Sequence, residues 1–157
     1  MERVEILSLI EQFQFNFLDD SRWQFIVSGL KNTIIITFFA VLLGVFLGFL
    51  IAIVRSTHDK TGKLKILNVI CRVYLTVIRG TPTMVQLLIV YYVIFATVDP
   101  GKVIVAIIAF GMNSAAYVAE IVRSGIMSID QGQFEAGRSL GLNYTQTMTK
   151  IILPQAV

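Results

Sequence analysis

Three long stretches without a charged residue divide the chain. They lie between Lys31 and Arg55, between Arg79 and Asp99, and between Lys102 and Glu120, and they contain 23, 19 and 17 residues. A helix needs about 20 apolar residues to cross a bilayer, and the third stretch reaches that length if its helix continues to Ile126. None of the stretches alternates apolar and polar positions with a period of two, so the pattern favours helices over the strands of a barrel.

The pattern therefore predicts an all-α membrane protein with three transmembrane helices, over about 26–54, 70–97 and 102–126. The second helix contains a break, because Gly80 lets the chain depart from helical geometry and Thr81 can cap a new helix that starts at Pro82. Broken helices in membranes usually line a cavity. A purely structural kink, with Arg79 reaching the membrane surface, is the alternative.

Basic residues predict the orientation of these helices. The link between the first two helices and the segment after the third are the basic parts, with Arg55, Lys60, Lys63, Lys65, Arg138 and Lys150, whereas the link between the second and third helices holds only Lys102. The positive-inside rule places the basic parts in the cytoplasm and the N-terminus outside. We expect residues 1–24 to form an external interfacial segment, with Trp23 near the lipid headgroups; a plain solvated tail is an equal alternative for residues 1–12.

The composition supports this class and narrows the function. Apolar residues make up 55% of the chain and charged residues 15%, against about 25% charged in soluble domains. Disorder and a well-solvated globule are excluded, and the net charge of +3 is a topology signal that needs no nucleic-acid partner. The lone cysteine, Cys71, cannot form an internal disulfide. No P-loop is present, and His58 lacks neighbours for metal binding or catalysis, so we expect no catalytic site, metal or cofactor on this chain.

Small residues recur at every fourth position of the first helix, at Ala40, Gly44, Gly48 and Ala52. Such a stripe lets a second transmembrane helix approach closely. The third helix carries a polar stripe about 80° wide, made of Ala106, Ala109, Asn113, Tyr117, Glu120 and Ser124. This stripe belongs in a bundle interior or along a solute path. Alternatively, Glu120 and its helical neighbour Arg123 lie at the cytoplasmic membrane boundary, and the sequence does not decide between the two.

Capping signals predict a helix–turn–helix after the third transmembrane helix, over about 128–150. Asp130 and Gln133 have the spacing of a capping box, Gly141 is a natural helix stop, and Asn143 with Gln146 repeats the capping pattern. We expect this compact hairpin to dock into a groove of another protein.

These segments resemble a known family. The run Glu135-Ala136-Gly137, with Gly141 four positions later and the Ile-x-Leu-Pro of residues 151–154, resembles the Glu-Ala-Ala loop of binding-protein-dependent ABC import permeases. Gly137 departs from the motif, which usually has alanine there. The run 79–82 with Gln86, and residues 113–123, resemble the permeases for polar amino acids, the histidine/glutamate/glutamine/arginine/opine branch. The resemblance covers about residues 21–157.

The resemblance implies a fold and a set of site residues. The fold is part of a type I ABC importer transmembrane domain, here residues 25–157, whose Glu-Ala-Ala loop inserts into a cleft of a cytoplasmic ATPase. The docking residues implied are Glu135, Ala136, Gly137, Leu140 and Gly141, and we interpret the small size of Ala136 and Gly137 as room for the close approach of a docked helix. The candidate substrate pathway consists of Arg79, Thr81, Pro82, Gln86, Asn113, Tyr117 and Glu120.

The function implied is that of a permease subunit in an ATP-driven, binding-protein-dependent importer of polar amino acids in a bacterial cytoplasmic membrane. The implied partners are ATPase subunits that hold ATP and Mg, a second permease chain, an extracytoplasmic amino-acid-binding protein and the lipid bilayer. In this family the Ile-x-Leu-Pro run leads to further transmembrane helices, usually two, so we expect an incomplete domain. The alternative is a truncated membrane interaction or assembly protein that does not transport. An intramembrane enzyme would need paired catalytic groups that the sequence does not offer.

Overall fold

The computed structural model describes residues 14–18 and 21–156, and all regular secondary structure in these residues is helical. The four main helices are α2 (Trp23–Thr61), α3 (Lys65–Gly80), α4 (Thr83–Ile89) and α5 (Lys102–Ser128). The shorter elements are the π-helical turns η1 (Gln14–Leu18), η3 (Val90–Ile94) and η4 (Met148–Ile152) and the helices α6 (Gln131–Ser139), α7 (Tyr144–Thr147) and α8 (Leu153–Ala156). The predicted all-α membrane fold is confirmed: α2 and α5 are long and apolar enough to cross a membrane, and α3 with α4 and η3 makes a third, bent candidate span.

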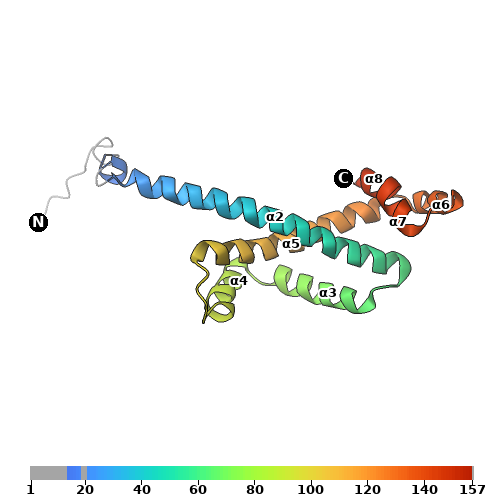
Figure 1. Ribbon diagram of the computed structural model, residues 1–157, viewed down its shortest axis with the longest axis horizontal. Helices are drawn as coiled ribbons and strands as arrows, with labels where there is room; N and C mark the ends of the chain where they lie inside the picture. The colour runs from blue at the N-terminus through green and yellow to red at the C-terminus, as the bar shows by residue number, and fades with distance from the viewer. Residues whose placement is uncertain (1–13, 19–20, 157) are drawn as a thin grey trace, which may run out of the picture.

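Helices α2 and α5 cross at the centre of the molecule and form its main packing interface (Figure 1). The predicted stripe of small residues lies in this interface, where Ala40, Gly44, Gly48 and Ala52 are all buried. A Cβ atom on Gly48 would lie 2.7 Å from Cβ of Val118 and 2.8 Å from the carbonyl oxygen of Ala115. The two backbones are therefore as close as glycine permits.

The first span is longer than predicted. The helix runs through the basic residues after Val54 as far as Thr61, because no glycine or proline interrupts it before Gly62. Gly62 has a φ of 67°, and its N–H donates to the carbonyl of His58, which ends the helix in a left-handed turn. Most of the predicted basic link is therefore an extension of α2.

The second span differs most from the prediction of one helix over 70–97. Helix α3 already begins at Lys65, and its axis and that of the α4–η3 segment differ in direction by 112° at the break. Leu75 and Ile78 of α3 pack on Ala116 and Ala119 of α5. The opposite side of α3 is apolar and exposed. The third span keeps its predicted start at Lys102 and extends two residues beyond the prediction, to Ser128.

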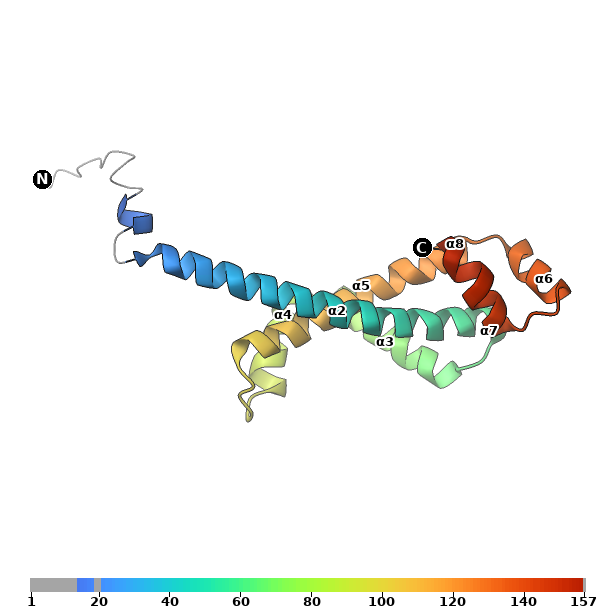
Figure 2. The ribbon, with the colours of Figure 1, turned by 45° about the horizontal axis from the view of Figure 1, so that its top comes forward.

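The helices after α5 fold back as a compact unit on its C-terminal end (Figure 2). A small core made of Ile126, Phe134, Met148 and Ile152 joins α5, α6 and η4. Only Ile129 and Asp130 separate the end of α5 from the start of α6. In both ribbon views this unit lies beside the C-terminal end of α2.

The N-terminal part of α2 extends beyond the other helices in both views. Phe25 is 78% exposed and Ile34 60% exposed, so this apolar surface is available for contact with lipid or another chain. Before α2, the guanidinium of Arg22 lies 4.5 Å from the centre of the Phe15 ring. Residues 1–13 and 19–20 of the predicted interfacial segment lie outside the described residues, and its place at the membrane surface stays a prediction.

Candidate translocation and docking sites

The break between α3 and α4 is held by the side chain of Gln86. Its Nε2 group donates to the carbonyl oxygens of Ile78, at 2.6 Å, and Thr81, at 3.0 Å, and lies 2.8 Å from Oγ1 of Thr81. Its Oε1 atom accepts from Nδ2 of Asn113 at 3.1 Å. The buried amide thus satisfies carbonyls that the end of α3 leaves unpaired and links the break to α5.

The prediction that Thr81 caps the following helix is wrong. Pro82 occupies the N-cap position of α4, and no side chain caps that helix. The Thr81 hydroxyl donates instead to the carbonyl of Val77, one turn back in α3. Thr81 therefore belongs to the end of α3, and Gln86 supplies the polar contacts that the break requires.

We expect Gln86→Leu to destabilise the protein by about 2 kcal/mol, because the buried carbonyl of Ile78 and the amide of Asn113 each lose a partner. The measurement is thermal unfolding of the purified protein in detergent. Gln155→Leu is the matched control, since this exposed side chain donates only to the carbonyl of Ile151. Equal melting temperatures for the two variants would contradict the role given to Gln86.

A cluster of charges surrounds Glu120 on α5. Its Oε2 atom lies 3.2 Å from Arg55 of α2 and 3.6 Å from Arg79 at the end of α3, and its Oε1 atom lies 3.0 Å from Arg123. Arg123 also pairs with Asp59 of α2 at 3.1 Å. Three arginines therefore share two carboxylates, and the cluster keeps an excess of one positive charge. The cluster links α2, α3 and α5 through these ion pairs.

The cluster borders a cavity of about 220 Å³ lined by Arg55, Arg72, Leu75, Thr76, Arg79 and Glu120. Sequence reasoning paired Glu120 with Arg123, and the structure confirms that pair. Sequence reasoning missed the part that Arg55, Asp59 and Arg72 play at this site. A signal for two of them was present, because the small-residue stripe of α2 continues with the buried Ser56. Arg55 and Asp59 lie beside that position, on the same side of the helix.

Most of the predicted pathway residues lie along one polar line. Asn113, Tyr117 and Glu120 follow one another on α5; Gln86 contacts the first of them, and the Arg79 guanidinium lies 5.8 Å from the ring centre of the second. Pro82 lies at the break, and its carbonyl oxygen accepts from the backbone N–H of Gln86 at 3.2 Å. Glu120 ends this polar line in the charge cluster; whether that level is the cytoplasmic membrane boundary stays a prediction.

The predicted hairpin forms through its own capping contacts. Asn143 and Gln146 make the predicted capping box, with both reciprocal hydrogen bonds at 2.9 Å. Gly141 has a φ of 76° and follows the end of α6, as expected of a helix stop. The predicted box at Asp130 and Gln133 is not formed, because Oδ1 of Asp130 accepts from the N–H of Gly132 instead. Asp130 still caps α6, through the N–H of Gly132 rather than that of Gln133.

The docking residues do not all face outward. Glu135, Ala136, Leu140 and Gly141 are exposed, and Leu140 keeps 76% of its surface accessible. Gly137 is buried, and a Cβ atom there would lie 2.7 Å from the Thr147 side chain. Its small size therefore lets α6 pack on α7, contrary to the interpretation that it permits close approach of a docked partner.

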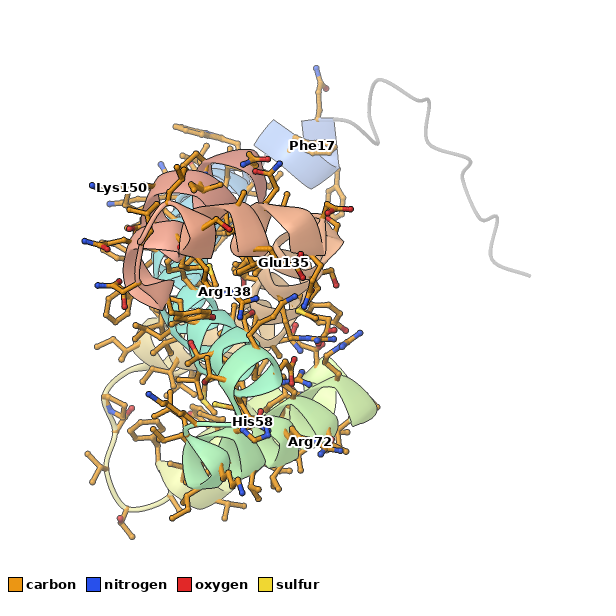
Figure 3. All side chains as sticks on the ribbon, turned by 90° about the vertical axis from the view of Figure 1, so that its right-hand side faces the viewer. Phe17, His58, Arg72, Glu135, Arg138 and Lys150 are labelled. Carbon is orange, nitrogen blue, oxygen red and sulfur yellow. The ribbon has the colours of Figure 1, made fainter. Side chains whose placement is uncertain are left out.

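Figure 3 views the hairpin end of the molecule, with Glu135 and Arg138 on α6, Lys150 at the outer edge, and His58 and Arg72 on the helices below. His58 bonds through Nδ1 to the carbonyl of Lys63 and serves the turn between α2 and α3. Among residues 14–18 and 21–156, no group of three or more His, Cys, Asp or Glu side chains is arranged to hold a metal ion.

The chain is thus a helical membrane protein with a broken span, a polar line across three helices and a hairpin fixed to the end of α5. Residues 41–157 match the family described as "Binding-protein-dependent transport system inner membrane component". The chain belongs to this family.

Similar proteins include the probable amino-acid ABC transporter permease protein YckA of Bacillus subtilis, which is 35% identical over 95% of this chain and 66% of its own length. The L-cystine transport system permease protein TcyB of the same organism is 34% identical over 99% of this chain and 65% of its own length. The putative glutamine transport system permease protein GlnP of Rickettsia prowazekii is 37% identical over 85% of this chain and 60% of its own length. The chain thus spans less than two thirds of these relatives.

A solved structure agrees with this assignment. The crystal structure of an amino acid ABC transporter with histidines contains a chain that superposes with a TM-score of 0.66 at 36% sequence identity. The match covers 83% of this chain and 64% of the other chain. The type I ABC importer fold implied by the motifs is therefore confirmed.

Proposed function

We propose that this chain is the transmembrane permease subunit of an ATP-driven, binding-protein-dependent importer of polar amino acids. The observation that carries the proposal is the polar line of α5, from Asn113 through Tyr117 to Glu120, which meets the broken helix at Gln86 and Arg79. Polar groups on a membrane helix are costly unless they face protein or a solute path, and discontinuous helices commonly border such paths.

The charges along this line suit a zwitterionic solute. An amino acid carries a carboxylate and an ammonium group, and Arg79 and Glu120 offer groups of the opposite signs 3.6 Å apart. Both side chains keep part of their surface accessible, at 44% and 26%. The names of relatives, which include amino-acid, L-cystine and glutamine permeases, support the same substrate class.

The hairpin would couple this path to ATP hydrolysis on a separate subunit. Leu140 is a large apolar side chain exposed at the end of α6, with Glu135 and Ala136 exposed on the same short helix. Such a protruding, internally packed hairpin suits insertion into a groove of a cytoplasmic ATPase. The proposal includes a second permease chain, an extracytoplasmic binding protein, and an orientation with the hairpin in the cytoplasm of a bacterium.

Transport by proteoliposomes tests the function directly. The chain is reconstituted with an ATPase and a binding protein of an amino-acid importer, and uptake of labelled glutamine, arginine and cystine is measured with and without ATP. ATP-dependent uptake that unlabelled polar amino acids suppress is expected. A complex that assembles, hydrolyses ATP and moves none of these solutes would favour the second function, a non-transporting membrane assembly protein.

We expect Leu140→Asp to weaken association with the ATPase about tenfold or more, because an exposed apolar anchor is replaced by a charge. Co-purification and titration with the isolated ATPase measure the effect. The thermal stability of the variant should stay unchanged, since Leu140 is mostly exposed. Thr145→Asp adds the same charge at an exposed position of α7 and should bind as the original chain does. Gly137→Arg is the less informative variant, because it also disrupts packing on Thr147.

Unchanged ATPase affinity of Leu140→Asp would show that α6 does not dock through this end. Unchanged affinity with intact transport would leave the transport function standing and remove only the docking role.

A further inference from the structure

A second cavity, separate from the polar line, lies between the C-terminal end of α2 and the hairpin. It has a volume of about 210 Å³ and is lined by Lys60, Thr61, Gln131, Phe134, Arg138, Tyr144 and Thr147. Its lining contains two basic side chains and no acidic one. The cavity is smaller than the roughly 300–1,000 Å³ usual for sites of drug-sized ligands, and its size suits a compact anionic group.

The two basic residues that line the cavity come from different helices. Lys60 comes from α2; its Nζ atom donates to Oε1 of Gln131 at 2.6 Å and lies 4.5 Å from the centre of the Phe134 ring. These neutral neighbours fix the ammonium group without neutralising it. Arg138 comes from α6, and no carboxylate pairs with it within residues 14–18 and 21–156. The nearest acid on α2, Asp59, is already paired with Arg123.

Tyr144 and Thr147 also line the cavity, each with a buried hydroxyl group. Thr147 is 2% exposed, and its Oγ1 atom is buried without a hydrogen-bond partner in the described part of the chain. A buried hydroxyl without a partner is uncommon and costly. The Tyr144 hydroxyl is buried beside Thr57, and burial raises the pKa of this phenol, so it remains protonated and able to donate near neutral pH.

We propose that this cavity is a binding site for a phosphate group, held by Lys60 and Arg138 and by the hydroxyls of Tyr144 and Thr147. Phosphate oxygens accept several charge-assisted hydrogen bonds at once, which matches the two cations that α2 and α6 contribute and the two buried hydroxyl groups of α7. A phosphate bound here would fasten the hairpin to the end of α2.

The source of the phosphate group is either a lipid headgroup or free phosphate. Lys60 lies five residues, or about 7.5 Å at 1.5 Å per residue, beyond Arg55, where the charge-free stretch of α2 ends. The headgroup region of a bilayer extends about 5–7 Å beyond each side of the hydrocarbon core. If the hydrocarbon core ends at Arg55, the cavity lies at the outer limit of the headgroup region, within reach of lipid phosphates.

Binding to the full chain in detergent tests the site without any partner subunit. Native mass spectrometry and thermal shift are measured while a short-chain phosphatidylglycerol, the matching phosphatidylcholine or inorganic phosphate is titrated. We expect saturable binding of at least one of these probes and a higher melting temperature when it is bound. Binding of a lipid but not of inorganic phosphate assigns the site to a headgroup, and the reverse assigns it to free phosphate.

Substitutions connect the binding to this cavity. Arg138→Gln should weaken the bound probe about tenfold, because one charge-assisted hydrogen bond is lost. Thr147→Val should weaken it about fivefold and leave the unliganded protein at least as stable, since the hydroxyl has no partner to lose. Lys150→Gln is the matched control: it removes a basic side chain at the outer edge of the same hairpin (Figure 3) and should bind as the original chain does.

Two results would overturn the site. One is the absence of saturable binding for all three probes. The other is equal affinity for the Arg138→Gln, Thr147→Val and Lys150→Gln variants, which would show that the anion attaches to the basic surface in general. Both readouts are independent of transport and of ATPase binding, so failure here leaves the proposed function untouched.

Discussion

Replacing Gly48 by leucine should prevent the close packing of α2 on α5 and leave little folded protein. The first new atom, Cβ, would lie 2.7 Å from Cβ of Val118 and 2.8 Å from the carbonyl oxygen of Ala115. The oxygen belongs to a helix backbone and cannot move aside as a side chain can. Overpacking typically costs about 1–3 kcal/mol, and leucine adds three further carbons beyond Cβ, so we expect a loss above 3 kcal/mol.

The same helix supplies a matched control. A Cβ atom added to Gly29 would meet nothing within 4 Å, so Gly29→Leu should fold normally. The measurement is the yield of monodisperse protein in detergent, followed by its melting temperature. Gly48→Ala should lie between the two leucine variants. If Gly48→Leu matched Gly29→Leu in yield and melting temperature, the small-residue stripe would not determine how α2 and α5 pack.

Replacing Glu120 by glutamine should destabilise the protein by about 3 kcal/mol and abolish transport. Removing one partner of a buried ion pair costs about 3–5 kcal/mol, because the remaining charge is left uncompensated. The lower value applies because the Glu120 side chain is 26% exposed. Arg79 contributes little to this loss, because its side chain is 44% exposed and solvent screens its charge. The loss should come mainly from Arg55 and Arg123, at 3.2 and 3.0 Å.

A double-mutant cycle isolates the contact between the two long helices. Arg55→Gln and Glu120→Gln are measured singly and together by thermal unfolding in detergent. Because the two side chains touch, we expect a coupling energy of about 1–2 kcal/mol, so that the double variant is less damaged than the sum of the singles. Lys102→Gln, at the opposite end of α5, is the control and should combine additively with Glu120→Gln. Additive effects for Arg55 as well would disprove the ion pair.

The sequence predicted those features that depend on neighbouring residues. Charge-free stretches mark α2 and α5, since a membrane helix needs a continuous apolar run. Gly141 and the Asn143–Gln146 box end and start helices through contacts within four residues. The prediction that Thr81 caps α4 was wrong because a local capping rule considers only the nearest residues. The Gln86 side chain reaches back five residues and makes the polar contacts at this turn.

The charge cluster lay beyond sequence reasoning for a different reason. Arg55 and Glu120 are 65 positions apart, and Arg123 and Asp59 are 64 apart. Which basic residue meets Glu120 depends on where α2 crosses α5, and the stripe of glycines fixes that crossing only once both helices are placed. Gly137 was misread because its neighbour, Thr147, is set by the hairpin turn.

The direct attachment of the hairpin to α5 has a mechanical consequence. Helix α5 has 27 residues, which corresponds to a rod about 40 Å long at 1.5 Å per residue. The hairpin core packs on the last turns of this helix through Ile126. Asn113 lies near the middle of the helix. A tilt of 5° imposed at the hairpin would therefore displace Asn113 by about 2 Å, a helix shift of a size seen in switching proteins and large enough to break its 3.1 Å hydrogen bond with Gln86.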